Sequence, residues 1–374
     1  MTDTISQDDL AELRSSVRDF LATKSTDHQL RSAMESARGW DPLVWSLLTS
    51  QLGVQSMALP VEYGGDGYGF RELRVVLEEM GRALLPSPFF STVVLAGSAL
   101  LAAGDAGACA TYLPQIAAGE ITATLAVAES DGLWRTDALN TRAVLAENRW
   151  TLRGNKIFVV DGASADLILV VAATETGPSL FAVEAEAANL TRTPMTTLDM
   201  TRHQAALSFD HTPAVLLGEP GQAASVVERV LDLAATALAA EQCGAARACL
   251  EAATNYARER TQFGRPIGSF QAVKHKCADM LARVSLADAA AAEAADAADG
   301  VPDAPPLAIA AAVAHSVCSE ALMFVASENI QVHGGIGFTW EHSAHLYFRR
   351  AKASQLCFGG PAVYHERVLH AFGI

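Results

Sequence analysis

Charge is scarce in this chain, and positive charge is the scarcer kind. Only 18% of the 374 residues are charged, with 42 acidic against 27 basic side chains and a net charge of −15. Contact with phosphate backbones needs a basic face, so this balance disfavours a nucleic-acid-binding protein. Half of the residues are apolar, which argues against disorder and supplies the cores of two or three domains.

Signals for export, disulfides and membrane spans are also lacking. The six cysteines form no CxxC pair, and most of them lie among Ala and Leu, where a reduced, buried cysteine is expected. The N-terminal MTDTISQDDL has no apolar core of a signal peptide. Two long uncharged stretches, residues 42–61 and 83–104, contain prolines or several polar residues, so neither is expected to span a membrane. A cytoplasmic protein is expected.

Common cofactor and nucleophile motifs are absent. The sequence has no GxGxxG after a strand, no P-loop, no HExxH and no GxSxG. His342 and His345 lie three apart, but nothing nearby completes a ligand set, so no metal site is expected.

The pattern of apolar residues divides the chain into three parts. Residues 6–119 favour helices joined by tight loops, and a helix is expected from about Gly221 to Arg260. A helix over 287–298 and a last helix starting near Pro306 follow. Between these helical parts, short β-type runs occur at residues 122–128, 143–147, 150–152, 156–160, 167–172, 180–183 and 205–209. This order predicts an α+β multidomain fold with domains at 1–120, 121–220 and 221–374.

Two glycine-containing loops follow long helical segments. Residues 258–271 combine arginine, glutamine and phenylalanine with glycine, a set that suits an anion attached to a planar ring. Arginines that complement a helix dipole are an equally good reading of that segment. Residues 331–341 contain three glycines, which permit close approach of a ligand or another subunit, or make a plain tight turn.

Both loops resemble signatures of the acyl-CoA dehydrogenase family. The strings RTQFGRPIGSFQAVKHKCADM (260–280) and QVHGGIGFTWEHSAHLYFRRA (331–351) carry the resemblance, and residues 62–65 and 78–82 fit the family's N-terminal domain. The resemblance implies a helical N-terminal domain, a middle β-domain and a C-terminal four-helix bundle, assembled as a dimer of dimers. It also implies FAD, an acyl-CoA thioester substrate and an electron-transfer flavoprotein partner.

The same resemblance assigns residues to the cofactor. FAD would be held from one subunit by Arg260, Gln262, Phe263 and Gln271, and its adenosine–pyrophosphate part from the neighbour by Gln331, Gly334 and Gly335. Family chemistry needs a glutamate that removes the α-proton while hydride leaves the β-carbon.

Neither position at which the family carries this glutamate holds a carboxylate. The usual position falls on Phe358, and the alternative position on the long helix falls on Ala234. Glu241 is a weak candidate, because seven residues place it about 10 Å farther along that helix, where a structural hydrogen bond is the simpler role. Glu341 follows a motif aromatic and is expected to organise its loop.

The middle domain departs from the family as well. Residues 128–134 (AESDGLW) stand where the family has Thr-Glu-Pro followed by Gly-Ser-Asp. Phe158 stands in the segment that covers the flavin ring and could stack there, although the family's threonine is lost. Gly360 replaces a common flavin-contacting threonine.

Such a pattern resembles the subunit without the catalytic glutamate in two-chain (α2β2) members, which bind two flavins in place of four and act on steroid-type CoA esters. The homologous partner would supply the base. Three alternatives stay open: an active homotetramer with an atypical base, a non-catalytic scaffold or nucleic-acid-associated relative, and a flavin oxidase or monooxygenase on the same fold.

Overall fold

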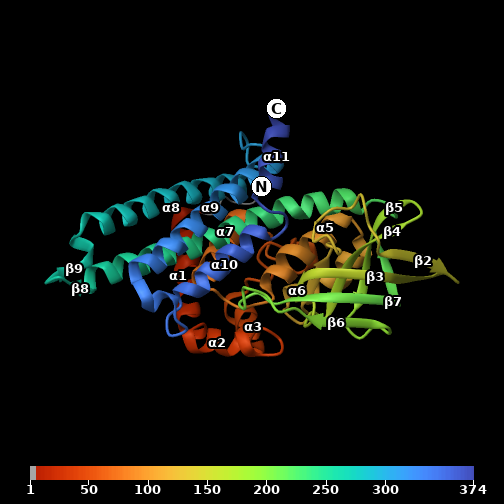
Figure 1. Cartoon of the computed structure of the whole chain (residues 1–374). Coiled ribbons are helices and arrows are strands. Elements are labelled where there is room, and N and C mark those ends of the chain that lie inside the picture. Colours follow the sequence, from red (N-terminus) through yellow and green to blue (C-terminus); the bar gives the residue numbers. More distant parts are fainter. Residues whose placement is uncertain (1–5) are drawn as a thin grey trace. The chain divides into compact units, whose positions relative to one another are not determined.

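The structure is a computed structural model that describes residues 6–374 (Figure 1). Residues 1–5 lie outside the described residues. They are the first half of MTDTISQDDL, the segment in which no signal-peptide pattern was found. Internal contacts divide the chain into two compact units. The helical unit comprises residues up to 30, 69–85 and 235–374, and the barrel unit comprises 31–68 and 86–234. Helices α2 (Asp27–Glu35) and α7 (Ala223–Glu259) each contain a boundary between the two.

Seven strands make the sheet of the barrel unit. They are β1 (Ala123–Ala126), β2 (Arg142–Ala146), β3 (Arg149–Val160), β4 (Leu167–Thr174), β5 (Gly177–Glu184), β6 (Leu190–Pro194) and β7 (Gln204–Leu217). Neighbouring strands run β4–β2–β3–β7–β5, and β5 pairs again with β4, which closes the sheet into a barrel. Inward-facing Leu152, Ile168, Phe181 and Leu207 are buried in its core, as the two-residue period of strands requires.

The sequence located this barrel but misplaced some strands. The runs expected at 150–152 and 156–160 are one strand, β3, because Gly154 does not form a turn. A Cβ on Gly154 would lie 2.6 Å from the Cα of Thr141, so glycine allows a close backbone approach within the sheet. Strand β6 was not expected, since Leu190–Pro194 carries one apolar residue and a terminal proline, and it pairs only at one edge, with β7.

Short helices complete the barrel unit. They are α3 (Pro42–Leu47), α5 (Ser98–Ala103) and α6 (Ala106–Ala117), with two π-helical segments, Leu48–Leu52 and Phe90–Gly97, and a 3₁₀ turn at Val61–Tyr63. The buried Phe90–Gly97 segment is tied to the barrel by Ser91, whose hydroxyl lies 2.6 Å from Asp161 Oδ2. Thr92 adds a reciprocal pair of hydrogen bonds with the backbone of Ala123.

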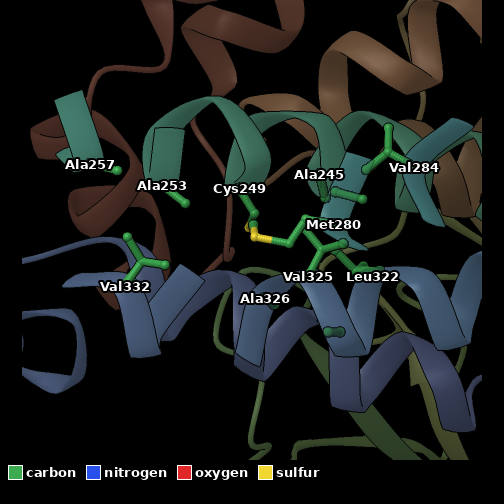
Figure 2. Packing of buried hydrophobic residues seen from close by; sticks show 12 residues of the cluster. Ala245, Cys249, Ala253, Ala257, Met280, Val284, Leu322, Val325, Ala326 and Val332 are labelled. Carbon is green, nitrogen blue, oxygen red and sulfur yellow. The ribbon is translucent and has the colours of Figure 1, made fainter. Parts of the chain in front are cut away.

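Long helices dominate the helical unit. Besides α1 (Gln7–Lys24), α4 (Phe70–Arg82) and the larger part of α7, it contains α8 (Gln271–Ala298), α9 (Leu307–His333), α10 (Ala344–Leu356) and α11 (Pro361–Ala371). The expected helix from 221 to 260 is confirmed as α7, whereas the helix near Pro306 is not the last, because α10 and α11 follow it. Figure 2 shows small and medium side chains, among them Ala253, Met280 and Val325, filling the space between α7, α8 and α9.

A buried ionic cluster joins α1, α4, α7 and α8. Glu78 is fully buried and pairs with Arg14 at 2.6 Å and Arg247 at 3.5 Å, while Glu79 accepts hydrogen bonds from Arg14 and Arg18. Arg247 also binds Asp288 of α8 at 2.7 Å. Burial raises the pKa of Glu79, but its two arginines outweigh this and hold the pKa below its usual range.

Helix α9 is apolar enough and long enough to cross a membrane by composition alone. Its window has a mean hydropathy of 1.7, but 61% of it is buried within the protein. Such burial is typical of a core helix, and α9 packs against α8, α10 and α11.

Candidate active site

The loop after α7 forms a small hairpin that projects the predicted FAD side chains outward. Strands β8 (Thr261–Gln262) and β9 (Arg265–Pro266) pair, and Ile267 N donates to Arg260 O at 2.8 Å. Phe263 and Gly264 make the turn with φ of 51° and 78°. As a result the Phe263 ring is 92% exposed, and Gln262 and Gln271 are exposed as well.

The second predicted cofactor loop begins at the end of α9. Gln331 lies on its last turn, and Gly334 and Gly335 start a 3₁₀ helix, Gly334–Phe338. A Cβ added to either glycine would meet nothing within 4 Å, so their backbone faces open space. Gly334 has a φ of 66°, which favours glycine at this helix end.

A stack of rings brings the two loops together. Tyr256, one turn before Arg260, stacks on His333 with ring centres 4.4 Å apart. His333 also lies 4.4 Å from the His342 ring, and its Nδ1 lies 2.8 Å from Asn329 O. The ends of α7 and α9 are therefore neighbours within the helical unit. Both His342 and His345 pack against other rings: His342 against His333, and His345 against Trp340 with ring centres 4.6 Å apart.

The chemistry of these exposed groups fits FAD as a ligand. Within residues 6–374 the Arg260 guanidinium has no hydrogen bond or ion pair, so its donors are free to bind an anion. Open glycine backbone at Gly334 and Gly335 allows close approach of a large ligand. An exposed aromatic ring and two exposed glutamine amides add a surface for planar rings and their polar edges.

Phe358 lies buried where the family glutamate was sought. It occupies the turn between α10 and α11 with a φ of 61°, and only 5% of it is exposed. The Tyr364 hydroxyl donates to Phe358 O at 3.2 Å, and the Tyr364 ring stacks on buried His315 at 3.8 Å. Burial lowers the pKa of His315 to about 4, so this imidazole is neutral at physiological pH.

The other two positions considered for a base are also built into the helices. Ala234 is fully buried on α7. Glu241, 8% exposed, lies 3.5 Å from the buried guanidinium of Arg350 on α10. The ion pair ties α7 to α10, which agrees with a structural role for Glu241.

In the barrel unit, Phe158 interrupts β3 with a φ of 54° at a bulge, and its side chain is 40% exposed. Nearby in sequence, Glu129 accepts hydrogen bonds from Lys156 Nζ at 2.9 Å and from the backbone of Asn140 and Thr141. Burial raises the pKa of Glu129, yet Lys156 and these amides bring it down to about 2.

Comparisons with known proteins agree with this architecture. Family models of the acyl-CoA dehydrogenase N-terminal, middle and C-terminal domains match residues 7–120, 124–212 and 223–371. This chain belongs to the acyl-CoA dehydrogenase family. Its members are oxidoreductases, and the chain has their three-domain fold of helical, β and helical parts; the exact boundaries at 120 and 220 stay predictions.

Several family members are similar over nearly the whole chain. Acyl-CoA dehydrogenase IpdE2 of Mycobacterium tuberculosis is 38% identical over 93% of this chain and 92% of its own. The Tcur3481-Tcur3483 steroid ACAD is 33% identical, covers 98% of both chains and has a TM-score of 0.86. The ChsE4-ChsE5 complex from Mycobacterium tuberculosis is 27% identical, with a TM-score of 0.89 and coverage of 100% and 99%.

Two side chains near the acyl-CoA dehydrogenase motifs escaped sequence reasoning. Lys156 is fully buried in β3, and its charge is paired there with Glu129, which lies 27 residues earlier in the sequence. Tyr364, also buried, supports the Phe358 turn from α11. No spacing signal links Tyr364 to position 358, since six residues across a turn match neither helical nor strand periodicity.

Proposed function

We propose that this chain is the subunit without a catalytic base in a heteromeric, FAD-dependent acyl-CoA dehydrogenase. The observation that carries the proposal is the chemistry of Phe358, a buried ring with no titratable atom at the family's usual base position. Ala234 leaves the alternative position equally empty. A homologous dehydrogenase chain would supply the glutamate. Similarity to a steroid ACAD and to the two-protein ChsE4-ChsE5 complex supports both the steroid-type CoA ester and the heteromer.

The proposed reaction is the α,β-dehydrogenation of a CoA thioester. A carboxylate of the partner removes the α-proton, which is acidic because the enolate is stabilised by hydrogen bonds to the thioester oxygen. Bound FAD supplies the acceptor for the hydride from the β-carbon, and an electron-transfer flavoprotein is proposed as its redox partner. We place the enzyme in the cytoplasm as part of the same proposal.

In this proposal, the chain contributes residues that bind FAD and residues that shape the active site. Arg260 would form charge-assisted hydrogen bonds to the pyrophosphate, where its free guanidinium meets negative charge. Gln262, Phe263 and Gln271 would hold the same FAD from the hairpin. Gln331, Gly334 and Gly335, at the end of α9, would meet the adenosine–pyrophosphate part of a FAD held by the neighbouring subunit. Phe158 is proposed to cover the flavin ring. Phe358, a buried ring, would stand at the position of the base.

Flavin content tests this proposal directly. The chain is purified alone and after co-expression with a homologous subunit that carries the family glutamate. We expect one FAD per two chains and acyl-CoA oxidation only in the co-expressed complex, with an electron-transfer flavoprotein or a dye as acceptor. One FAD per chain together with turnover by the chain alone would sink the proposal. Stoichiometric oxygen consumption would instead favour the oxidase alternative.

A pair of arginine variants tests the cofactor contact. Arg260→Gln removes a charge-assisted hydrogen bond, which corresponds to about 1.5–3 kcal/mol and hence roughly ten- to hundredfold weaker FAD binding. Arg229→Gln, an equally exposed arginine on the first part of α7, serves as the matched control and should keep full FAD content. Equal FAD loss in both variants would show that the hairpin has no specific role.

Glu241 is the remaining candidate for an atypical base. Its ion pair with Arg350 favours a structural role. Glu241→Gln in the assembled complex should therefore retain turnover, at a cost in thermal stability. Loss of turnover with an unchanged melting temperature would revive the homotetramer with Glu241 as its base.

A further inference from the structure

A pocket of about 490 Å³ lies on the outer surface of the barrel, and none of the residues assigned above to FAD or to the base lines it. Its floor is formed by alternate residues of two neighbouring strands. Arg142 and Val144 come from β2, and Thr151 and Arg153 come from β3. Because alternate residues of a strand point to the same face, all four side chains share this side of the sheet.

The two arginines of the floor face each other directly. Arg142 and Arg153 are register partners in the antiparallel pair of β2 and β3. Side chains at such positions start about 5 Å apart, and like charges there destabilise a sheet. Throughout residues 6–374, neither guanidinium has a hydrogen bond or an ion pair. Asp210 on β7 is the register partner of Arg153, but it does not form an ion pair with it. Two positive charges are thus held together without an anion, in a protein whose net charge is −15.

His211 completes the rim through a strained bulge. Leu152 pairs with Thr212 and Arg153 with Asp210, so His211 is the extra residue of a β-bulge in β7. Its φ of 56° lies in the left-handed region, which is costly for a residue with a side chain. Bulges of this kind redirect a side chain, and here His211 lines the pocket beside the two arginines.

Negative charge in the lining is already balanced. Glu129 lines the pocket, but its carboxylate binds Lys156 and two backbone amides, and the residue is only 6% exposed. Besides His211, the remaining polar lining consists of Ser130, Asn140, Thr151 and Asn155, which carry amide and hydroxyl donors. The free charge of the pocket is therefore positive.

We propose that this pocket binds the phosphate group of a phosphate monoester. A tetrahedral dianion accepts hydrogen bonds from two arginine forks at once and removes their mutual repulsion. The amides of Asn140 and Asn155 can bind the remaining oxygens, and Val144 offers an apolar surface for the organic part. Free inorganic phosphate and the phosphorylated adenosine end of a CoA ester share this chemistry.

Thermal shift and calorimetric titration of the full chain with two probes test the site. The probes are inorganic phosphate and adenosine 3′,5′-bisphosphate, at low ionic strength because salt screens such contacts. Each should raise the melting temperature of the wild-type chain, since a ligand that binds only the folded state stabilises it. Arg142→Gln/Arg153→Gln should bind at least tenfold more weakly. Arg149→Gln, an exposed arginine of β3 outside the pocket, is the matched control and should bind as wild type does.

The outcomes separate the two sources and can overturn the site. Tighter binding of the bisphosphate identifies a nucleotide phosphate, and equal or tighter binding of inorganic phosphate identifies the free anion; both support the pocket if the double variant loses them. Without ligand the double variant should melt no lower than wild type, because two like charges are gone. Should it fail to fold, Arg153→Gln alone serves as the test. Equal binding by variant and wild type, or no binding by wild type, overturns the proposal. These results do not depend on FAD or on a partner chain.

Discussion

Lys156 and Glu129 form a buried charge pair in the barrel, 2.9 Å apart, with the lysine Nζ also donating to Val127 O. Burial lowers the pKa of Lys156 to about 8, while the neighbouring Glu129 raises it, so Lys156 stays charged at neutral pH. Lys156→Met leaves Glu129 buried without its cation, and we expect a loss of about 3–5 kcal/mol in the free energy of unfolding. Urea denaturation measures it. The double variant with Glu129→Gln should recover much of the loss, and no recovery would show that packing, not charge, is responsible.

The same pair sets an acid dependence of stability. The pKa of Glu129 is about 2 in the folded protein against an ordinary value of 4.5, so the folded state binds fewer protons. The stability contributed by Glu129 is therefore complete above about pH 4.5 and disappears as the pH falls toward 2. Glu79 shifts in the same direction, so the difference between wild type and Lys156→Met isolates Glu129. The urea midpoints of the two proteins should approach each other as the pH falls from about 4.5 toward 2, and parallel curves would contradict this assignment.

His211 keeps a backbone conformation that only glycine adopts without cost. With its φ of 56°, His211→Gly should stabilise the chain by up to about 1 kcal/mol. The neighbouring Thr212 is a buried strand residue whose hydroxyl donates to Asn189 O at 2.8 Å, so Thr212→Gly should destabilise it. Calorimetric melting compares the two. A lower melting temperature for His211→Gly would mean that its side chain contributes more than the bulge costs.

At the scale of elements, α4 and α7 cross on two glycines. A Cβ on Gly81 would lie 2.0 Å from Glu241 O, and a Cβ on Gly244 would lie 1.7 Å from Glu78 O. Both clashes are with backbone, so Gly244→Ala must separate the helices and should cost about 1–3 kcal/mol or more. Gly107→Ala in α6 meets only a side-chain oxygen at 3.4 Å and should be neutral or stabilising by up to about 1 kcal/mol. The melting temperatures of Gly244→Ala and Gly107→Ala test this prediction. Equal changes in the two variants would refute the tight crossing of α4 and α7.

The sequence predicted periodic elements better than close approaches. Helix α7 was expected within two residues of its observed ends, because its apolar stripe repeats at helical spacing. Gly154 was interpreted as a boundary between strands, since sequence alone does not distinguish a glycine that turns from one that admits a neighbouring backbone. At the candidate site, motif residues such as Arg260 were identified by resemblance. The supports of Phe358 come from α9 and α11, and such pairings follow from the tertiary fold.

At the scale of the whole molecule, large apolar side chains remain exposed in the C-terminal third of the sequence. They include Phe263, Phe338, Trp340, Leu356 and Phe372, each at least 54% exposed. Exposed apolar side chains of this size are typical of surfaces that another chain or a ligand covers. This exposure is expected of a subunit that functions in an assembly.

Phe263 gives this expectation a sharp test. Since its ring is 92% exposed, Phe263→Ala should change the free energy of unfolding of the isolated chain by less than about 0.5 kcal/mol. An aromatic anchor at an interface contributes about 2 kcal/mol or more, so the variant should weaken assembly or FAD retention by roughly tenfold or more. Size-exclusion chromatography with flavin absorbance measures both. Val215→Ala, 61% exposed on β7, is the control and should leave them unchanged. If Phe263→Ala assembles and holds FAD like this control, the hairpin is no contact surface, and the proposed role of Arg260 beside it is weakened with it.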